Sequence, residues 1–184
     1  MGYALAEELA RRGAEVILIS GPTTLTVKHP AIHRIDVTTA SEMYSAVTEH
    51  FEAMDAAIMA AAVADFTPET VRQDKIKDKS LNLKLIPTKD IAAELGAMKR
   101  RGQILAGFAL ETGNETENAV KKLSQKNFDF IVLNSLNDAG AGFGYTTNKI
   151  TIIGKDGHTT QFDLKSKRDA AKDIVDKIVT CWKQ

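Results

Sequence analysis

The sequence predicts an α/β protein with a doubly wound, mostly parallel, Rossmann-like sheet, helices on both faces, and a C-terminal β-hairpin followed by a helix. Two observations predict this fold class. Amphipathic helical stretches alternate with short apolar runs along the 184 residues, which is the pattern of a parallel sheet covered on both faces. The apolar content of 43% and the charged content of 26% are those of an ordinary globular chain. A single domain over residues 1–184 is therefore expected.

The first predicted element is a helix over residues 3–10, where apolar residues recur at three- and four-residue spacing and Gly13 follows as a C-cap. Residues 14–20 form a β-branched run that ends at Gly21-Pro22, which predicts a buried strand. The same reasoning predicts a strand at 34–37, a helix from Thr39 or Ser41 to 51, and a strand at 55–61.

The second half continues the alternation after a polar stretch at 65–80. The alternating residues Leu81, Leu83 and Leu85 predict that a strand resumes there. Further elements are expected as helices at 89–100, 114–125 and 167–183, strands at 103–109 and 128–133, and a glycine-rich loop at 139–144. An Asp156-Gly157 pair between 150–153 and 159–162 predicts the hairpin.

Charge and cysteine content exclude several classes of protein. Lys and Arg number 24 and Asp and Glu number 24, so no net charge attracts nucleic acid or an anionic membrane. The one cysteine, Cys181, makes neither an internal disulfide nor a cysteine zinc site. The longest apolar run, 56–64, is too short to span a bilayer, and the charges within 7–12 are unlike a signal peptide. We therefore expect a cytoplasmic protein that binds neither membrane nor nucleic acid.

In parallel sheets, ligands bind beyond the carboxyl ends of the strands. The strand predicted at 55–61 ends in Ala60, Ala61 and Ala62, and Asp65 follows. Small residues at a strand end let a ligand lie against the backbone, and a carboxylate can accept a base amino group, a hydroxyl or a metal. The alternative is a tight turn with an exposed aspartate.

Lysines form two further groups of candidates. Lys75, Lys77 and Lys79 alternate along the polar stretch, where they could neutralise phosphate or simply form a solvated surface. Lys122 and Lys126 share one helix face, an arrangement that is mildly unfavourable unless an anion lies between them.

Other candidates lie at the ends of later strands. Phe108 could stack on a base or belong to the core, and Asn134 could bind a ligand or form a turn. The histidines are not spaced as ligands and no GxGxxG or Walker A motif is present, so no protein metal site is predicted.

Several segments occur in an order that resembles one known family. They are the Met-Gly-Tyr-Ala-Leu-Ala start, residues 18–22, Ala-Ala-Val-Ala-Asp-Phe at 61–66, Lys-Ile-Lys at 75–77, Asp90-Ile91, residues 107–112, Asn134, Gly-Phe-Gly at 142–144, and Asn148. Together they resemble the phosphopantothenoylcysteine synthetases of coenzyme A biosynthesis, which in many bacteria form the C-terminal half of a bifunctional synthetase/decarboxylase. The pairing of the 61–66 and 75–77 motifs is the most specific part of the resemblance.

The resemblance implies a CTP-dependent ligase. The carboxylate of 4′-phosphopantothenate attacks the α-phosphate of CTP, so that an acyl-cytidylate forms and pyrophosphate leaves. The amine of L-cysteine then attacks the acyl carbon and releases CMP. Such chemistry needs charge neutralisation on the triphosphate and exclusion of water. Mg²⁺ is expected with the CTP, and the family forms homodimers.

The resemblance also implies roles for individual residues. Lys75 matches the catalytic lysine that contacts nucleotide phosphate. The other nucleotide-binding residues that it implies are Ala60, Ala61, Ala62, Asp65, Asp90, Ile91, Phe108, Lys122 and Lys126. Lys89 stands where the family usually has proline before Asp90. No residue is assigned to the acyl substrate.

The family begins with a strand, a glycine-rich turn and an Asn-containing loop that would end just before Met1. The sequence is therefore expected to be an N-terminally truncated synthetase domain, which alone would be inactive. Two other classes remain open: an NAD(P)-binding Rossmann-fold oxidoreductase, and a non-catalytic nucleotide-binding or dimerisation module.

Overall fold

The computed structural model describes the chain except residues 72–73, 78–79, 112, 136–143 and 184. It confirms the predicted fold class. The main sheet has the strand order β10-β9-β7-β6-β3. Its strands are β3 (Ala56–Met59), β6 (Ile104–Glu111), β7 (Phe130–Ser135), β9 (Thr151–Gly154) and β10 (Thr159–Gln161). Strands β3, β6 and β7 are parallel, whereas β9 and β10 form the predicted antiparallel hairpin at one edge.

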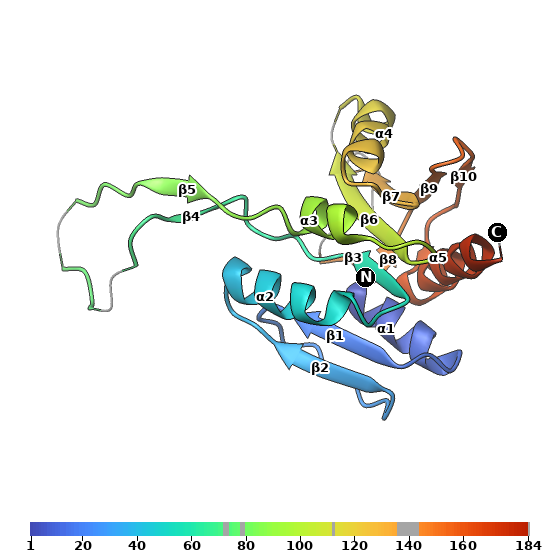
Figure 1. Cartoon of the computed structure of the whole chain (residues 1–184), viewed down its shortest axis with the longest axis horizontal. Coiled ribbons are helices and arrows are strands. Elements are labelled where there is room, and N and C mark those ends of the chain that lie inside the picture. The colour runs from blue at the N-terminus through green and yellow to red at the C-terminus, as the bar shows by residue number, and fades with distance from the viewer. Residues whose placement is uncertain (72–73, 78–79, 112, 136–143, 184) are drawn as a thin grey trace.

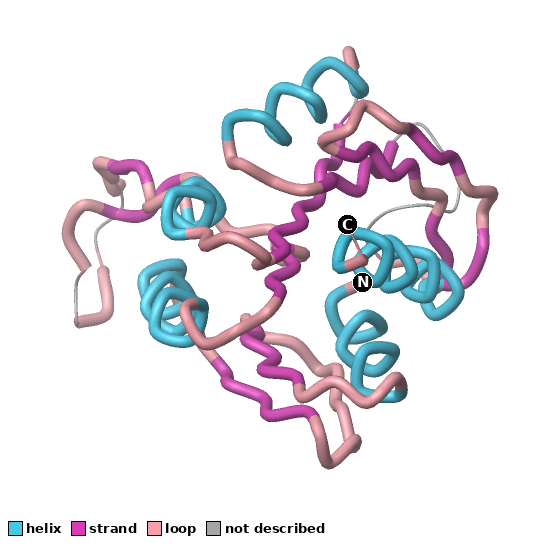
Figure 2. The backbone as a smooth tube through the Cα atoms, turned by 45° about the vertical axis from the view of Figure 1, so that its right-hand side comes forward, coloured by secondary structure: helices cyan, strands magenta, loops and turns pink. Residues whose placement is uncertain are grey.

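Helices cover both faces of this sheet. They are α1 (Gly2–Arg11), α2 (Ala40–Phe51), α3 (Ile91–Met98), α4 (Glu115–Gln125) and α5 (Lys167–Trp182). Figure 2 shows the two helices nearest the termini together on one side of the central strands. We call that side the α1–α5 face, where Ala106, Phe130 and Val132 are buried. On the other side, the α2–α4 face, Leu105 and Ile131 are buried. Alternate residues of each strand therefore enter separate cores.

A second pair of parallel strands, β1 (Val16–Ser20) and β2 (Ile32–Asp36), forms a separate sheet. Ile19 and Ile35 pack against the same core as Met59 of β3, so the pair belongs to the same layer. Among the described residues, β1 has no strand partner opposite β2, and β3 has none opposite β6. The apolar residues of β1 before Ser20, and all four of β3, are only half-buried. The single continuous sheet that the sequence indicated is thus interrupted between β1 and β3.

An arm extends from the body between β3 and α3 (Figure 1). It contains β4 (Phe66–Pro68) and β5 (Leu85–Pro87), which pair antiparallel. The prediction of a strand from Leu81 is wrong for residues 81–84, because pairing begins only at Leu85. Leu81, Leu83 and Leu85 are all exposed, so their alternation does not mark a buried face. Strand β4 lies within the polar stretch at 65–80, where no strand was predicted.

Two very short strands, β8 (Thr147–Asn148) and β11 (Lys165–Ser166), pair antiparallel just before α5. Ser166 caps α5 by accepting a hydrogen bond from the backbone N–H of Asp169 at 3.1 Å. Of the helices that the structure describes, none has the length and apolar character to cross a membrane. The glycine-rich loop predicted at 139–144 lies outside the described residues except for Gly144, which has a left-handed φ of +81°.

A buried carboxylate ties α1 to its own C-terminal turn and to α5. Glu8 is 3% exposed and accepts hydrogen bonds from Arg11 Nε and Nη2 and from Arg12 Nε, at 2.9, 2.7 and 2.7 Å. Arg12 also donates to Asp176 of α5 at 2.5 Å. The hydrogen bond from Arg11, with a second from Arg12, outweighs burial and lowers the pKa of Glu8 to about 2.

Replacement of Glu8 by glutamine should reduce the free energy of unfolding at neutral pH by about 1–3 kcal/mol, because charge-assisted hydrogen bonds are lost. Since the folded-state pKa of Glu8 is depressed to about 2, its stabilisation is present above the unfolded-state pKa of about 4.3 and disappears as the pH falls toward 2. Urea unfolding at a series of pH values measures the difference between the two proteins. The control is Glu7→Gln, an exposed position on the same helix. A Glu8→Gln deficit that is equally large at pH 2.5 and pH 7 would contradict this account.

Candidate functional site

The carboxyl ends of β3 and β6 form the edge at which the sequence places a ligand. Ala60 follows β3 directly, and its backbone N–H donates to the carbonyl of Ile58 at 3.1 Å, so the chain turns at once. Ala60 is half-buried beside α1, where a Cβ built on Gly2 would lie 3.8 Å from the Ala60 Cβ. Ala61 and Ala62 are exposed. The small side chains of Ala61 and Ala62 thus leave the backbone accessible at this edge.

Thr88 holds the two ends of the arm together at this edge. Its backbone N–H donates to the carbonyl oxygen of Asp65 at 2.9 Å, and its hydroxyl donates to the carbonyl oxygen of Ala64 at 2.7 Å. The side chain of Asp65 is exposed. Asp65 and Asp90, far apart in the sequence, are therefore brought to the same part of the edge. Sequence reasoning missed Thr88, because its role depends on a contact across 24 residues.

Asp90 begins α3 and carries an ion pair. Its Oδ1 accepts the backbone N–H of Ala93 at 3.1 Å as an N-cap, and Lys126 Nζ lies 3.1 Å from the same oxygen. Partial burial raises the pKa of Asp90, but the Ala93 N–H and the Lys126 ammonium outweigh it, so that the pKa is lowered. Asp90 is therefore an anion at neutral pH, and Lys126 is aimed at the start of α3.

The lysine that stands in place of proline at position 89 does not disturb this cap. Lys89 Nζ lies 4.0 Å from the centre of the Tyr44 ring of α2, a cation–π distance. The next residue after the cap, Ile91, is 4% exposed and belongs to the core of the α2–α4 face. Ile91 can therefore meet a ligand at this edge through its backbone, not through its buried side chain.

The two lysines of α4 lie near its C-terminal end. Lys122 is half-buried in the last turn, and Lys126 is the C-cap residue. The backbone of Lys126 packs tightly against Gly96 of α3, where an added Cβ would collide with the Lys126 carbonyl. This close approach lets the Lys126 side chain run along α3 to Asp90. The sequence predicted that the two lysines share a helix face but did not indicate that Asp90 is the partner of Lys126.

Phe108 lies on the opposite side of the sheet from these lysines. It is half-buried against the core of the α1–α5 face, as is Ala60. The predicted residues therefore divide between the two sides of one strand edge. Ala60 and Phe108 belong to the α1–α5 face, whereas Asp90, Lys122 and Lys126 belong to the helices of the α2–α4 face.

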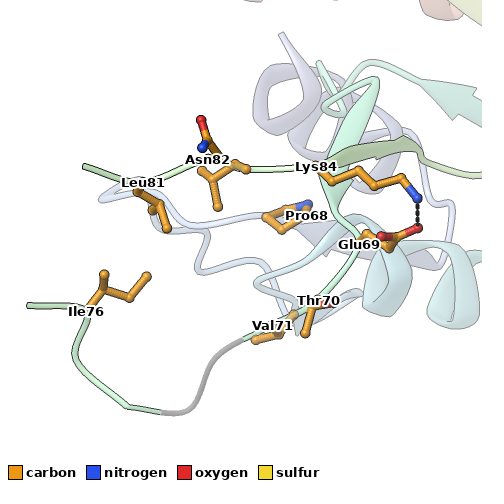
Figure 3. Close-up of a pocket in the computed structure, with 9 residues that line it drawn as sticks. Pro68, Glu69, Thr70, Val71, Ile76, Leu81, Asn82 and Lys84 are labelled. Atoms are coloured by element: carbon orange, nitrogen blue, oxygen red, sulfur yellow. Dashed lines mark hydrogen bonds and ion pairs between the residues drawn. The ribbon is translucent and has the colours of Figure 1, made fainter. Parts of the chain in front are cut away.

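The structure does not bring Lys75 to this edge. Lys75 is exposed and precedes Ile76, which lies on the arm (Figure 3). The arm extends away from the body (Figure 1). A groove of about 400 Å³ lies there, with apolar walls that include Val71, Ile76 and Leu83. Lys84 is paired with Glu69 at 2.6 Å beside it (Figure 3). Lys77 is also exposed, and Lys79 lies outside the described residues.

Comparisons with known proteins show a match along nearly the whole chain. The model of the DNA/pantothenate metabolism flavoprotein C-terminal domain matches residues 1–181. A protein of an unknown prokaryotic organism, named cysteine/cysteine sulfinic acid decarboxylase, is 54% identical over 98% of this chain and 51% of its own length. The coenzyme A biosynthesis bifunctional protein CoaBC of Bacillus subtilis is 46% identical over 100% of this chain and 46% of its own length. The chain thus spans about half the length of these curated relatives.

A solved structure is similar in both sequence and fold. It is the crystal structure of the C-terminal domain of a coenzyme A biosynthesis bifunctional protein CoaBC, at 38% identity and a TM-score of 0.80. The match covers 96% of this chain and 79% of that one. The overall fold is therefore shared with that C-terminal domain.

Substitution of Lys126 by methionine should raise the pKa of Asp90, because the carboxylate loses its ammonium partner. A partly exposed ion pair contributes about 0.2–1 kcal/mol, which corresponds to a rise of about 0.2–0.7 pH units. Titration of the side-chain carboxyl carbon of Asp90 by NMR measures it. Lys172→Met is the matched control, because Lys172 pairs with Asp169 at 2.7 Å on another helix. An unchanged Asp90 titration in Lys126→Met would show that this ion pair does not form in solution.

Proposed function

The chain belongs to the DNA/pantothenate metabolism flavoprotein C-terminal domain family, and on that premise we propose that it is a phosphopantothenoylcysteine synthetase domain. It would join 4′-phosphopantothenate to L-cysteine in coenzyme A biosynthesis. The observation that carries the proposal is the match of the whole chain to a CoaBC C-terminal domain, together with an open strand edge flanked by lysines. The other relative is named a decarboxylase, but this chain matches only 51% of its length, so that name describes a longer protein.

The proposed reaction has two steps, both at the edge of β3 and β6. The carboxylate of 4′-phosphopantothenate attacks the α-phosphate of CTP, so that an acyl-cytidylate forms and pyrophosphate leaves. The amine of L-cysteine then forms the amide, loses a proton and displaces CMP. Lys126 reaches Asp90 at the start of α3, and Lys122 lies one turn earlier on α4; both would neutralise phosphate charge. Mg²⁺ would enter as the magnesium complex of CTP, held mainly by phosphate oxygens, and no protein ligand is assigned to it.

The nucleotide base would lie against the open backbone of Ala61 and Ala62, with the exposed carboxylate of Asp65 beside it. A carboxylate that accepts a hydrogen bond from the base amino group would favour cytosine over uracil, which has no amino group there and would leave the carboxylate unpaired. The methyl side chains of Ala61 and Ala62 leave the backbone open to the flat ring of the base. The preference for CTP over ATP in this proposal comes from the family resemblance.

The arm would supply Lys75 and the dimer contact. Its exposed apolar residues are Phe66, Val71, Ile76, Leu81, Leu83, Leu85 and Ile86. Apolar residues gathered on a projecting element mark an interaction surface. We infer that the arm packs against a second copy of the chain. Because Lys75 lies far out on the arm, it would reach phosphate when the arm bends toward the edge or meets the edge of the partner.

The open edges of β1 and β3 support a further part of the proposal. Unpaired strand edges in the middle of a layer leave backbone groups without partners. The start of α1 lies between the ends of these two strands, since a Cβ built on Gly2 would lie 3.8 Å from the Ala60 Cβ and the Tyr3 hydroxyl hydrogen-bonds Ser20 Oγ at 2.9 Å. We propose that an additional strand completes the sheet here in the active protein, and that the chain alone has little activity.

The test of function therefore uses a chimera in which this chain replaces its matching region in the Bacillus subtilis relative. The chimera should release pyrophosphate only when CTP, Mg²⁺ and 4′-phosphopantothenate are all present, and should form 4′-phosphopantothenoylcysteine when L-cysteine is added. Mass spectrometry identifies the product. Nucleotide binding without pyrophosphate release would instead support a non-catalytic module, and binding of NADPH in preference to CTP would support an oxidoreductase.

In the chimera, Lys75→Gln should lower the rate of pyrophosphate release by about 10²–10³-fold, because a charge-assisted contact to the transferring group is lost in the transition state. The melting temperature should not change, since the lysine is exposed. Lys84→Gln is the matched control on the same arm, where the lysine pairs with Glu69. Turnover at the unsubstituted rate by Lys75→Gln would show that Lys75 is only a solvated charge.

The exposed apolar residues of the arm lead to a separate prediction about assembly. Leu83 is 60% exposed on the arm and Leu164 is 48% exposed on the body. Leu83→Lys should convert a dimer into a monomer, because a charge is placed within the apolar contact. Leu164→Lys should leave the dimer intact. Sedimentation velocity on the chain distinguishes the two, and a Leu83→Lys protein that stays dimeric would place the interface elsewhere.

A further inference from the structure

Residues 88–90 join strand β5 of the arm to helix α3. The first of them, Thr88, makes two hydrogen bonds back to the segment that enters the arm. Its backbone N–H donates to the carbonyl oxygen of Asp65 at 2.9 Å, and its hydroxyl donates to that of Ala64 at 2.7 Å. We call these two bonds the Thr88 clamp. The clamp ties the point where the chain enters the arm to the point where it leaves the arm.

The body of the protein anchors the residues that follow Thr88. Lys89 Nζ lies 4.0 Å from the centre of the Tyr44 ring of α2. Asp90 caps α3 and pairs with Lys126 Nζ of α4 at 3.1 Å. Ile91 is 4% exposed in the core of the α2–α4 face. Residues 89–91 are therefore held by three different helices.

The segment on the other side of the clamp has much less support. Of residues 61–65, only Val63 is half-buried, against the core of the α2–α4 face, and the others are exposed. Exposed backbone with few packing contacts is the part of a fold that moves most easily. The clamp holds Ala64 and Asp65 against the anchored segment, and thereby limits where the Asp65 carboxylate can lie.

The two bonds of the clamp depend on different parts of Thr88. The backbone bond continues the pairing of β4 with β5, in which Phe66 lies opposite Pro87, and every residue except proline has the N–H that it needs. The bond to Ala64 needs a side-chain donor. Because water competes for partly exposed partners, this second bond adds little to the stability of the fold. Its main effect is to fix the backbone next to Asp65.

We propose that Thr88 is a positioning residue for nucleotide binding, which acts by holding the Asp65 carboxylate at a fixed place relative to the Asp90–Lys126 pair. The carboxylate side and the lysine side of the nucleotide site are then set before the nucleotide arrives, so that less freedom is lost when it binds. This inference rests on the proposed synthetase function. It gives a role to a residue outside the nucleotide-binding residues named above.

A purely structural role for Thr88 makes a different prediction. If the hydroxyl only stabilises the base of the arm, its loss affects all substrates alike, and the effect persists when the Asp65 carboxylate is absent. If the hydroxyl acts through Asp65, its loss weakens the binding of CTP alone, and the effect disappears once the carboxylate has been removed. A double-mutant cycle therefore separates the two roles.

The experiment measures the Kd for CTP by calorimetry, and kcat/KM for CTP and the KM for 4′-phosphopantothenate by turnover, all in the chimera. Thr88→Val keeps the side-chain shape and removes the hydroxyl, whereas Thr88→Ser keeps the hydroxyl. Asp65→Ala and the double substitution with Thr88→Val complete the cycle. The matched control is Thr67→Val, because Thr67 is also a half-buried threonine and lies in β4 of the same arm.

We expect Thr88→Val to raise the Kd for CTP by roughly 3- to 10-fold, the effect of one neutral hydrogen bond. Thr88→Ser should bind CTP within about 2-fold of the unsubstituted chimera, and the KM for 4′-phosphopantothenate should change less than about 2-fold in both variants. In the Asp65→Ala background, Thr88→Val should have no further effect on the Kd or on kcat/KM for CTP. Thr67→Val should leave all three quantities unchanged.

Two results would overturn the inference while leaving the synthetase function standing. One is a Thr88→Val chimera that binds CTP as tightly as the unsubstituted protein. The other is a Thr88→Val effect of equal size with and without the Asp65 carboxylate. If Asp65→Ala binds CTP too weakly for calorimetry, kcat/KM, which needs no saturation, completes the cycle. If Thr88→Val does not fold, Thr88→Ala takes its place. Absence of both CTP binding and turnover in the unsubstituted chimera would contradict the proposed function itself, and the inference with it.

Discussion

The parallel pairing of β3, β6 and β7 brings three strand ends to one edge of the sheet. Met59 is in register with Gly107, and Phe108 with Val132. At Gly107 the strand β6 lies close against Phe128, and an added Cβ would collide with the Phe128 ring. Because strand side chains alternate, the register also decides which residues face which core. Ala60, Phe108 and Asn134 inherit their positions from this pairing.

The edge has two chemically different sides. The α2–α4 face contributes charge, with Asp90 and Lys126 paired across the start of α3. The α1–α5 face contributes small, aromatic and amide groups, namely Ala60, Phe108 and Asn134. The proposed reaction brings a nucleoside triphosphate and 4′-phosphopantothenate, which is itself an anion, within reach of one point, and so needs positive charge at this edge. The described residues contain no group of three or more His, Cys, Asp or Glu side chains that could hold a metal ion.

The sequence predicted those helices and strands whose apolar pattern can be recognised within the element itself. Apolar runs indicate the strands β1, β3, β6 and β7, and apolar stripes at helical spacing indicate the helices α1, α4 and α5. The arm was predicted poorly, because Leu81, Leu83 and Leu85 alternate like a half-buried strand but are exposed in the single chain. Two-residue strands such as β8 are too short for any periodicity. The candidate residues were found largely by resemblance, whereas the Asp90–Lys126 pair, the Thr88 clamp and the hydrogen bond between Asn134 and Asn148 depend on contacts between distant segments.

The central claim is that the nucleotide binds at the carboxyl edge of β3 and β6, between the two faces. A crystal structure of the chimera with CTP and Mg²⁺ tests it most directly. The account predicts the base against Ala61 and Ala62 near Asp65, and the phosphates on the side of Lys122 and Lys126. A nucleotide bound at the opposite edge, near the amino ends of β6 and β7 and beside the Lys99–Asp129 ion pair, would contradict it.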